Sequence, residues 1–417
     1  MVATSTQVRP TRPPTRRPVR PRTERRWFLS WMKRHKTLCV VGVVLILLTP
    51  LWSSLGSALS DPSLGSTVPG RLAEWARDHG AGSVVSWAEN TWYSHHPPPV
   101  GGTPAPTAIP EFRSPQAHRA TAGAAAAIPN HLAAPLPIAP VASPPLAGEG
   151  QWRPVGRTVD GVPAVYETFV RPDAVHTSEV TGLAWMDASL LRAALYSGST
   201  IPGGGPWQLT APISPSAAIS LVAAFNAGFR MPDANGGYFT QGKTVVPLRQ
   251  GAASFVIYAD GSATVADWGR DASMTPNVVA VRQNLDLIVD DGRPVPGLNS
   301  SDNRQWGTTL GGAVYVWRSG IGVTSNGAFV YAGGPGLNIT DLANVLARAG
   351  AWRAMELDIN TDWVNLATYS PPTPDGAASP ANGTDLLPAM VGTPARYFDP
   401  WWSRDFITMS VRANLTP

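Results

Sequence analysis

The chain has 417 residues, of which 43% are hydrophobic and 14% charged, so it is long and apolar enough to form at least one packed domain. Residues 1–36 contain eleven Arg or Lys and one Glu, a net charge of +10, which leaves −6 for the rest of a chain whose total is +4. The basic character therefore belongs to a tail, and we expect no nucleic-acid partner. A single cysteine, Cys39, and the absence of His after His176 exclude disulfides from the chain and Cys/His zinc sites and His-based triads from its C-terminal half.

The N-terminal segments predict a membrane-anchored protein. Residues 1–36 are rich in Pro and Arg and have few apolar side chains to bury, which predicts a disordered cytoplasmic tail. Residues 37–57 carry no charge and are long enough to span a bilayer as one transmembrane helix. By the positive-inside rule, everything after this helix would be extracytoplasmic. A signal peptide cleaved near Gly56-Ser57-Ala58 is the alternative.

Two spacer segments are expected between the membrane and a C-terminal domain of residues 150–417. Residues 58–96 contain apolar and aromatic residues at helical spacing, which predicts short amphipathic juxtamembrane helices, either at the membrane surface or packed on the domain. Residues 97–149 hold 13 Pro and 14 Ala, a composition typical of an extended linker.

The domain is expected to be α+β, with β-rich mixed sheets and few helices. Short apolar runs flank Asp260-Gly261 and Asn326-Gly327, and such turns predict β-hairpins because glycine supplies the positive φ that they need. Asn338-Ile-Thr-Asp341 is similar to a capping box, and the apolar stripe after it ends at Gly350, which predicts a helix. A strand is expected next, over residues 353–360.

That strand carries candidate catalytic carboxylates. With a period of two it places Glu356, Asp358 and Asn360 on one face, opposite the core. Two carboxylates at this spacing lie about 7 Å apart at the backbone, near the separation of glycosidase acid and base pairs, and their proximity would separate their pKa values. A solvated strand face is the alternative. Asp362 and Trp363 follow, and they offer a further carboxylate and a ring on which a sugar could stack.

Other polar motifs give weaker predictions. Arg230 ends the motif Asn226-Ala-Gly-Phe-Arg230, and Arg318 lies in Trp317-Arg318-Ser-Gly-Ile-Gly322. A guanidinium can bind a phosphodiester through its planar fork. Residues 237–244 have the spacing of a nucleotide-binding Walker loop, but a strand-like run with Pro247 follows where a helix would be needed. We expect no cofactor, although a divalent cation could use several aspartates whose spacing fits no known loop: Asp286, Asp290, Asp291, Asp358 and Asp362.

Taken in chain order, these segments resemble the phosphodiester glycosidase family. The resemblance covers about residues 178–370 and rests on four segments in succession: Asn226-Ala-Gly-Phe, Arg318-Ser-Gly-Ile-Gly-Val-Thr-Ser-Asn-Gly327, the helix ending at Gly350, and Ala-Met-Glu-Leu-Asp358. Arg230 stands where the family has a second Phe, and residues 359–363 stand where it has Gly-Gly-Gly-Ser-Ser. Bulky side chains thus replace a close backbone approach, which implies either a different substrate or lost activity.

The resemblance implies hydrolysis of a sugar-1-phosphodiester at the anomeric carbon. The phosphomonoester is already a good leaving group, so little general-acid help is needed. The implied roles are Asp358 as nucleophile or base, Glu356 as its partner, Arg318 with Arg230 as a phosphate clamp, and Asn226 with Asn360 as ligands of sugar hydroxyls.

Two other kinds of function stay open. One is a non-catalytic, membrane-tethered protein that binds glycopolymers of the cell envelope with the same pocket. The other is a structural envelope component that works through its linker and juxtamembrane helices. The preference for Arg (29) over Lys (3), together with the many Ala, Pro and Gly, indicates a high-GC bacterium.

Overall fold

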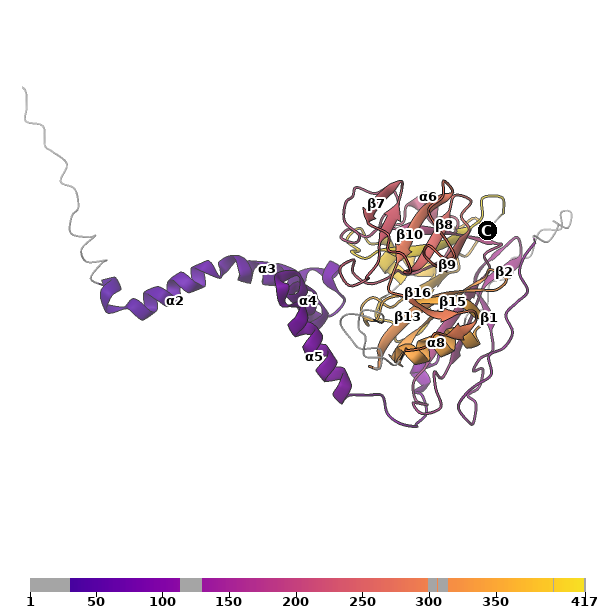
Figure 1. Cartoon of the computed structure of the whole chain (residues 1–417), viewed down its shortest axis with the longest axis horizontal. Helices are drawn as coiled ribbons and strands as arrows, with labels where there is room; N and C mark the ends of the chain where they lie inside the picture. Colours follow the sequence, from indigo (N-terminus) through magenta and orange to yellow (C-terminus); the bar gives the residue numbers. More distant parts are fainter. Residues whose placement is uncertain (1–30, 113–129, 299–305, 307–313, 393, 416–417) are drawn as a thin grey trace, which may run out of the picture. The chain divides into compact units, whose positions relative to one another are not determined.

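The computed structural model describes residues 31–112, 130–298, 306, 314–392 and 394–415, so most of the expected tail lies outside the described residues. The chain divides into two compact units, Met1–Ser57 and Ala58–Pro417. Helices come first and strands form the domain that follows (Figure 1).

The apolar segment forms two helices, α2 (Lys36–Leu47) and α3 (Thr49–Ser60). Within the described residues neither helix alone is long and apolar enough to cross a membrane, but the pair passes that test by length and composition, with a bend of 46° between them. A single transmembrane helix over residues 37–57 is therefore not confirmed, because the segment forms two helices with a bend between them. Pro50 lies at the break, where its ring and missing N–H interrupt the helical hydrogen bonds.

Residues 58–96 are mainly helical, as expected. Their elements are η1 (Pro62–Leu64), α4 (Val68–Ala76), η2 (Arg77–Ala81) and α5 (Gly82–His95). Thr67 caps α4, since its hydroxyl accepts from the N–H of Gly70 at 3.1 Å. In the kink between α4 and α5, Gly80 has a φ of 82°, a conformation that glycine adopts without strain.

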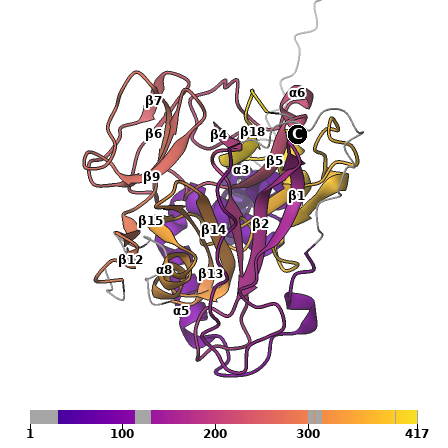
Figure 2. The ribbon, with the colours of Figure 1, turned by 90° about the vertical axis from the view of Figure 1, so that its right-hand side faces the viewer.

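Three sheets build the domain (Figure 2). The first contains β1 (Arg153–Val159), β2 (Val162–Val170), β3 (Thr181–Met186), β11 (Leu287–Asp290), β12 (Arg293–Pro294), β13 (Val316–Thr324), β14 (Phe329–Leu337) and β15 (Ala351–Glu356). The second contains β6 (Tyr238–Thr240), β7 (Lys243–Val246), β8 (Ala253–Tyr258), β9 (Ala263–Asp267) and β10 (Val278–Gln283). The third contains β4 (Leu191–Tyr196), β5 (Leu221–Asn226), β16 (Leu366–Tyr369), β17 (Gly383–Asp385) and β18 (Phe406–Val411).

The strand orders are β1-β2-β3-β14-β13-β15-β11-β12, β7-β6-β10-β8-β9 and β17-β16-β5-β18-β4. The short helices of the domain are η3 (Pro106–Ala108), α6 (Pro215–Ala218), η4 (Pro380–Asn382) and η5 (Pro394–Phe398), and the longer α8 spans Ile339–Arg348. The β-rich α+β class is confirmed. The paired strands are antiparallel, however, where mixed sheets were expected, because tight turns join several neighbours directly.

The local turn and cap predictions are confirmed. Gly261 and Gly327 have φ of 78° and 93° in the β8–β9 and β13–β14 hairpins. Asn338 caps α8 by accepting from the N–H of Asp341 at 2.8 Å. The Walker-like residues 237–244 form the β6–β7 hairpin and open no helix. β15 ends at Glu356, so the strand expected through residue 360 is shorter, and Asp358 lies in the loop after it.

Helix α8 packs against β13, β14 and β15 of the first sheet (Figures 1 and 2). A Cβ at Gly320 of β13 would lie 2.9 Å from the Leu346 side chain of α8 and 3.0 Å from the Met355 carbonyl oxygen of β15. Glycine thus permits the close approach that buries the apolar stripe of α8. This packing fixes the end of β15, from which the candidate site begins.

Part of the expected linker packs on the domain. Ile138 and Ala142 are buried, and the N–H of Ile138 donates to the Gly150 carbonyl at 2.9 Å. Glu149 forms a buried ion pair with Arg171 at 2.8 Å. These contacts offset the entropy lost by ordering the chain, so this stretch does not behave as a free spacer.

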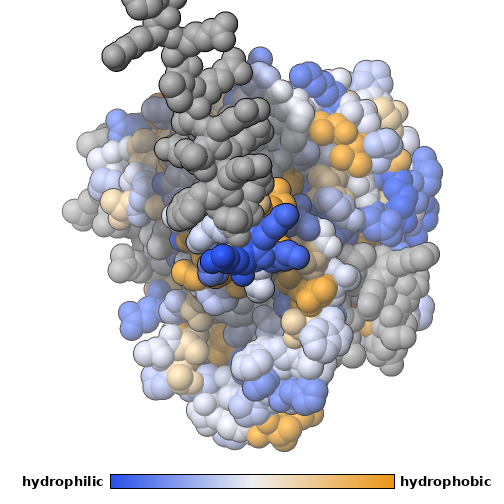
Figure 3. All heavy atoms as spheres, turned by 90° about the vertical axis from the view of Figure 1, so that its left-hand side faces the viewer, coloured by the Kyte–Doolittle hydropathy of each residue, from blue (hydrophilic) through white to orange (hydrophobic). Residues whose placement is uncertain are grey.

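On the face seen in Figure 3, exposed hydrophobic residues form small patches between hydrophilic ones.

Candidate active site

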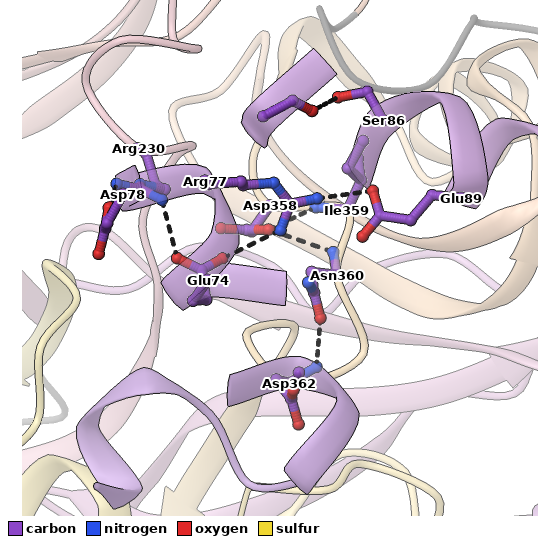
Figure 4. Close-up of polar contacts among 12 residues, drawn as sticks. Glu74, Arg77, Asp78, Ser86, Glu89, Arg230, Asp358, Ile359, Asn360 and Asp362 are labelled. Atoms are coloured by element: carbon purple, nitrogen blue, oxygen red, sulfur yellow. Dashed lines mark hydrogen bonds and ion pairs between the residues drawn. The ribbon is translucent and has the colours of Figure 1, made fainter. Parts of the chain in front are cut away.

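Asp358 lies in the loop directly after β15 and is held firmly in place. Its Oδ1 accepts from the backbone N–H groups of Ile359 at 2.8 Å and Asn360 at 3.1 Å (Figure 4). Its carbonyl oxygen accepts from the N–H and the hydroxyl of Ser319 on β13, at 2.9 and 2.8 Å. The carboxylate is therefore oriented by N–H groups of its own loop, and Ser319 of β13 holds the backbone of that loop.

Burial raises the pKa of Asp358 to about 6. The nearby Arg404 guanidinium and the two backbone N–H groups oppose this rise, while the Glu74 carboxylate adds to it. The side chain is only 5% exposed. Asp358 is thus ionised at neutral pH and loses its charge in mildly acidic conditions, a property suited to a nucleophile or a general base.

Asn284 joins the Asn226-Ala-Gly-Phe motif to the end of β15. Its Oδ1 accepts from the Phe229 N–H at 3.0 Å, and its Nδ2 donates to the Glu356 carbonyl at 2.9 Å. A Cβ at Gly228 would lie 2.8 Å from Asn284 Oδ1, so the motif requires glycine at this position. This bridge positions Arg230, the next residue after Phe229, at the mouth of the site.

Two arginines form the cationic wall of the site. Arg230 comes from the loop after β5, and Arg404 comes from the segment just before β18. The Arg404 guanidinium lies 4.4 Å from the centre of the Trp363 ring, and its Nη1 is buried with no hydrogen-bond partner among the described residues. An anion between these two guanidiniums would therefore find N–H donors available.

In this structure the anion is a carboxylate of the same chain. Glu74 of α4 pairs with Arg230 Nη1 at 3.1 Å and with Arg404 Nη2 at 3.4 Å. Asp78 of η2 also pairs with Arg230, and the helical segment carrying both acids lies over Asp358 (Figure 4). Only about 40 Å³ of cavity remains beside Asp358. The candidate site is therefore filled by the segment predicted to be a juxtamembrane helix.

Asp362 holds the beginning of α4 against the domain. Its carboxylate accepts from the Ser66 N–H at 3.3 Å and from the Thr67 hydroxyl at 3.4 Å. A Cβ at Gly70 would lie 2.1 Å from Asp362 Oδ2, so the helix can approach this closely only with glycine there. Asp362 was expected to bind substrate, and in this structure its partners are the first residues of the covering segment.

Glu356 and Arg318 form a buried ion pair behind the site. Their side chains are fully buried, and Arg318 Nη1 lies 2.5 Å from Glu356 Oε1. Arg318 also donates to the carbonyl oxygens of Leu337 and Val314. Burial raises the pKa of Glu356 to about 7. The positive charge of Arg318 opposes this rise in pKa, and the negative charge of Asp358 adds to it. The expected clamp of Arg318 with Arg230 is not present, because Arg318 faces into the sheet and pairs with Glu356.

Two further predicted ligands are occupied by protein groups. Asn226 donates to the Ser319 hydroxyl at 3.0 Å and accepts from the Tyr331 hydroxyl at 2.8 Å, so a sugar would have to displace these partners. Trp363 is 2% exposed, with Arg404 over one part of its ring and Trp402 edge-on at 5.4 Å, and so presents no open stacking face. Asn360 lines the cavity, and its Oδ1 accepts from the Asp362 N–H at 2.8 Å.

The aspartates considered for a divalent cation do not gather. Among the residues that the structure describes, no three His, Cys, Asp or Glu side chains are arranged to hold a metal ion. Asp286 pairs instead with Arg249 at 2.5 Å, and Asp290 pairs with Arg270 at 2.7 Å.

Sequence reasoning missed Glu74 and Arg404. Each belongs to no motif, and the two lie 330 residues apart in the chain. The one available signal was the helical spacing of residues 69–94, for which packing on the domain was a stated alternative.

Comparisons with known proteins identify part of the chain. Residues 220–358 match the model of the phosphodiester glycosidase family, a range that includes Asn226, Arg230, Arg318 and Asp358. No curated protein matches the chain. The catalytic domain of zebrafish N-acetylglucosamine-1-phosphodiester α-N-acetylglucosaminidase, auto-inhibited by its pro-peptide, is 13% identical, with coverage of 60% of this chain and 84% of that one and a TM-score of 0.36. A hypothetical protein from Synechocystis is 15% identical, with coverage of 62% and 64% and a TM-score of 0.33. A putative exported protein from Burkholderia pseudomallei is 13% identical, with coverage of 56% and 74% and a TM-score of 0.23.

Proposed function

Since residues 220–358 match the model of the phosphodiester glycosidase family, we propose that the protein is a hydrolase that cleaves a sugar-1-phosphodiester between the anomeric carbon and the phosphate oxygen. The observation that carries the proposal is the position of Asp358 beside two guanidiniums whose anionic partner is a carboxylate of helix α4. A substrate phosphate would take the place of the Glu74 carboxylate.

The phosphodiester would bind to Arg230 and Arg404. Both already hold a carboxylate. A phosphodiester also carries one negative charge and has unesterified oxygens that can accept from the planar fork of each guanidinium. The guanidiniums would also stabilise the charge that develops on the departing phosphate as its bond to carbon breaks. The phosphate clamp expected from the sequence thus retains Arg230, but Arg404 takes the place of Arg318.

Asp358 would act on the anomeric carbon. As a nucleophile, its carboxylate oxygen would bond to that carbon while the C–O bond to phosphate breaks and the phosphomonoester leaves with the electron pair; water would then hydrolyse the glycosyl ester. As a base, Asp358 would instead take a proton from the water that attacks the carbon. Both routes require the ionised carboxylate. Glu356 would act indirectly in either route: it pairs with Arg318 behind the site, and its charge interacts with that of Asp358.

Helix α4 must leave before substrate enters, because about 40 Å³ is too small for a sugar. The test uses the full chain and a nucleotide-diphosphate N-acetylhexosamine, with released free sugar as the readout. Glu74→Ala should raise the rate several-fold, since it removes the carboxylate that competes for both arginines. Glu89→Ala is the matched control, because Glu89 pairs with Arg77 of the same segment.

Two results would contradict the proposal. One is a well-folded Glu74→Ala protein that releases no sugar from a panel of such diesters. The other is release that persists unchanged when Asp358→Asn is added to Glu74→Ala. The first outcome would favour the non-catalytic reading, in which the same pocket binds envelope glycopolymers. A specific feature supports that alternative: Ile359 lines the cavity where the family has glycine.

We also propose that the protein is anchored in the cell membrane, with the domain outside and envelope glycoconjugates as substrates. The basic tail and the apolar pair α2–α3 support this location. Membrane fractionation with and without residues 1–57 tests it. A full-length protein that stays in the soluble fraction after expression would refute the anchor.

A further inference from the structure

A cavity of about 660 Å³ lies elsewhere on the domain and shares no lining residue with the Asp358 cavity. Its walls come from β2, β16, β17 and the segment around η3. Glu167 of β2, Asp385 of β17 and Glu111 are the charged residues that line it. Its described lining contains no Lys, Arg or His, so the cavity has a negative wall without a basic partner.

Glu167 is a buried carboxyl group, 3% exposed, and its Oε1 accepts no hydrogen bond from any described residue. Thr368, on β16, lines the same cavity, and its hydroxyl lowers the pKa of Glu167. One hydroxyl hydrogen could satisfy only one of the acceptor positions that a carboxylate presents. An unsatisfied buried acceptor is destabilising, so a group that donates a hydrogen bond here would be held firmly.

Asp385 adds a second carboxyl group to the same cavity. Asn365 Nδ2 donates to its Oδ1 at 2.8 Å. Burial raises the pKa of Asp385 to about 7 and that of Glu167 to about 8, and the charge of Asp385 contributes to the latter. Arg396 and Asn365 oppose the rise at Asp385, and the Thr368 hydroxyl opposes it at Glu167. A bound cation would compensate both acids at once.

We propose that this cavity is a binding site for a primary ammonium group carried on a small organic molecule. An ammonium nitrogen has three N–H donors, enough for Glu167, Asp385 and the Thr368 oxygen together. Phe112 and Leu386 line the same cavity and would contact the carbon part of the ligand. A bare metal ion fits less well, because no three His, Cys, Asp or Glu side chains among the described residues are arranged to hold one.

The experiment measures binding to the full-length protein by calorimetry at pH 7. The probes are n-butylamine and glucosamine, with 1-butanol and N-acetylglucosamine as their uncharged counterparts. Saturable binding of an amine with a Kd of about 10 mM or tighter is expected, with no saturation by its counterpart. Glu167→Gln should weaken the amine at least about tenfold, since it keeps the shape but removes the carboxyl group that would ionise and pair with the ammonium.

Asp341→Asn is the matched control, because Asp341 is a buried acid with an unpartnered Oδ2 that lies outside this cavity. It should leave amine binding unchanged. The proposal is overturned if neither amine saturates the folded wild-type protein, if the uncharged counterparts bind equally well, or if Glu167→Gln and Asp341→Asn have the same effect. A thermal melt of each variant establishes that it is folded.

Discussion

Replacing Gly70 by Ala tests whether α4 covers the site as the structure has it. The added Cβ would lie 2.1 Å from Asp362 Oδ2 and 3.3 Å from its Cγ. Asp362 cannot turn away freely, because its two oxygens accept from the Ser66 N–H and the Thr67 hydroxyl. Either the helix lifts or these two contacts break, and both changes loosen the covering segment.

The size of the effect follows from two opposing contributions. Overpacking of this kind costs about 1–3 kcal/mol. Alanine is favoured over glycine in a helix by roughly 1 kcal/mol, which acts in the other direction. The net loss of docking free energy is therefore about 1 kcal/mol, and up to about 2, which lowers the ratio of covered to open protein roughly fivefold to thirtyfold.

Hydrogen exchange over residues 62–78 and the rate of sugar release are the two readouts. Gly70→Ala should lower the protection of this segment and raise the rate together. Gly82→Ala is the matched control, since its Cβ would meet only Arg77 Cγ at 3.9 Å. In an Asp362→Ala background, Gly70→Ala should add little, because the clashing carboxylate is gone. Protection in Gly70→Ala equal to that in Gly82→Ala would refute this account of the covered site.

Three further results are expected. Asp358→Asn should reduce sugar release by at least about 100-fold, and the rate of the wild type should fall as the pH drops below about 6, where Asp358 becomes protonated; a flat profile between pH 5 and 7 would contradict its role. Burial raises the pKa of Glu167 from 4.5 to about 8, so its contribution to stability is present below about pH 4.5 and is lost as the pH rises to 8. Glu167→Gln should therefore exceed the wild type in unfolding free energy at pH 9, by up to about 5 kcal/mol, and should equal it at pH 4. Arg318→Ala should cost about 3–5 kcal/mol of unfolding free energy in urea titrations, because it leaves Glu356 buried without its cation; Arg318→Ala combined with Glu356→Gln should recover part of that loss.

The sequence alone predicted those features of the fold that depend on neighbouring residues. The hairpins at Gly261 and Gly327 and the cap at Asn338 follow from short-range rules, and the structure contains all three. The pairing of distant strands into three sheets had no such signal. Mixed sheets were expected, whereas the paired strands are antiparallel.

The candidate site was predictable to the same extent. The motif resemblance led to Asp358 and Arg230, which the structure brings to one cavity. It also led to Arg318, because a sequence does not distinguish an arginine that faces a ligand from one that pairs inside a sheet. Arg404 and Glu74 depend on a contact between the two ends of the chain, and no periodicity or motif reports such a contact.

The covering carboxylate is part of the same molecule as the site that it fills, which makes Glu74 a tethered competitor. Dilution does not release it, and every substrate competes with a carboxylate whose effective concentration is fixed by the chain that connects α4 to the domain. If only a fraction of molecules is open, the apparent affinity for substrate falls by that fraction while the turnover of the open form is unchanged. The apparent affinity of this site for substrate would then depend on the free energy with which α4 docks on the domain as much as on the arginines themselves.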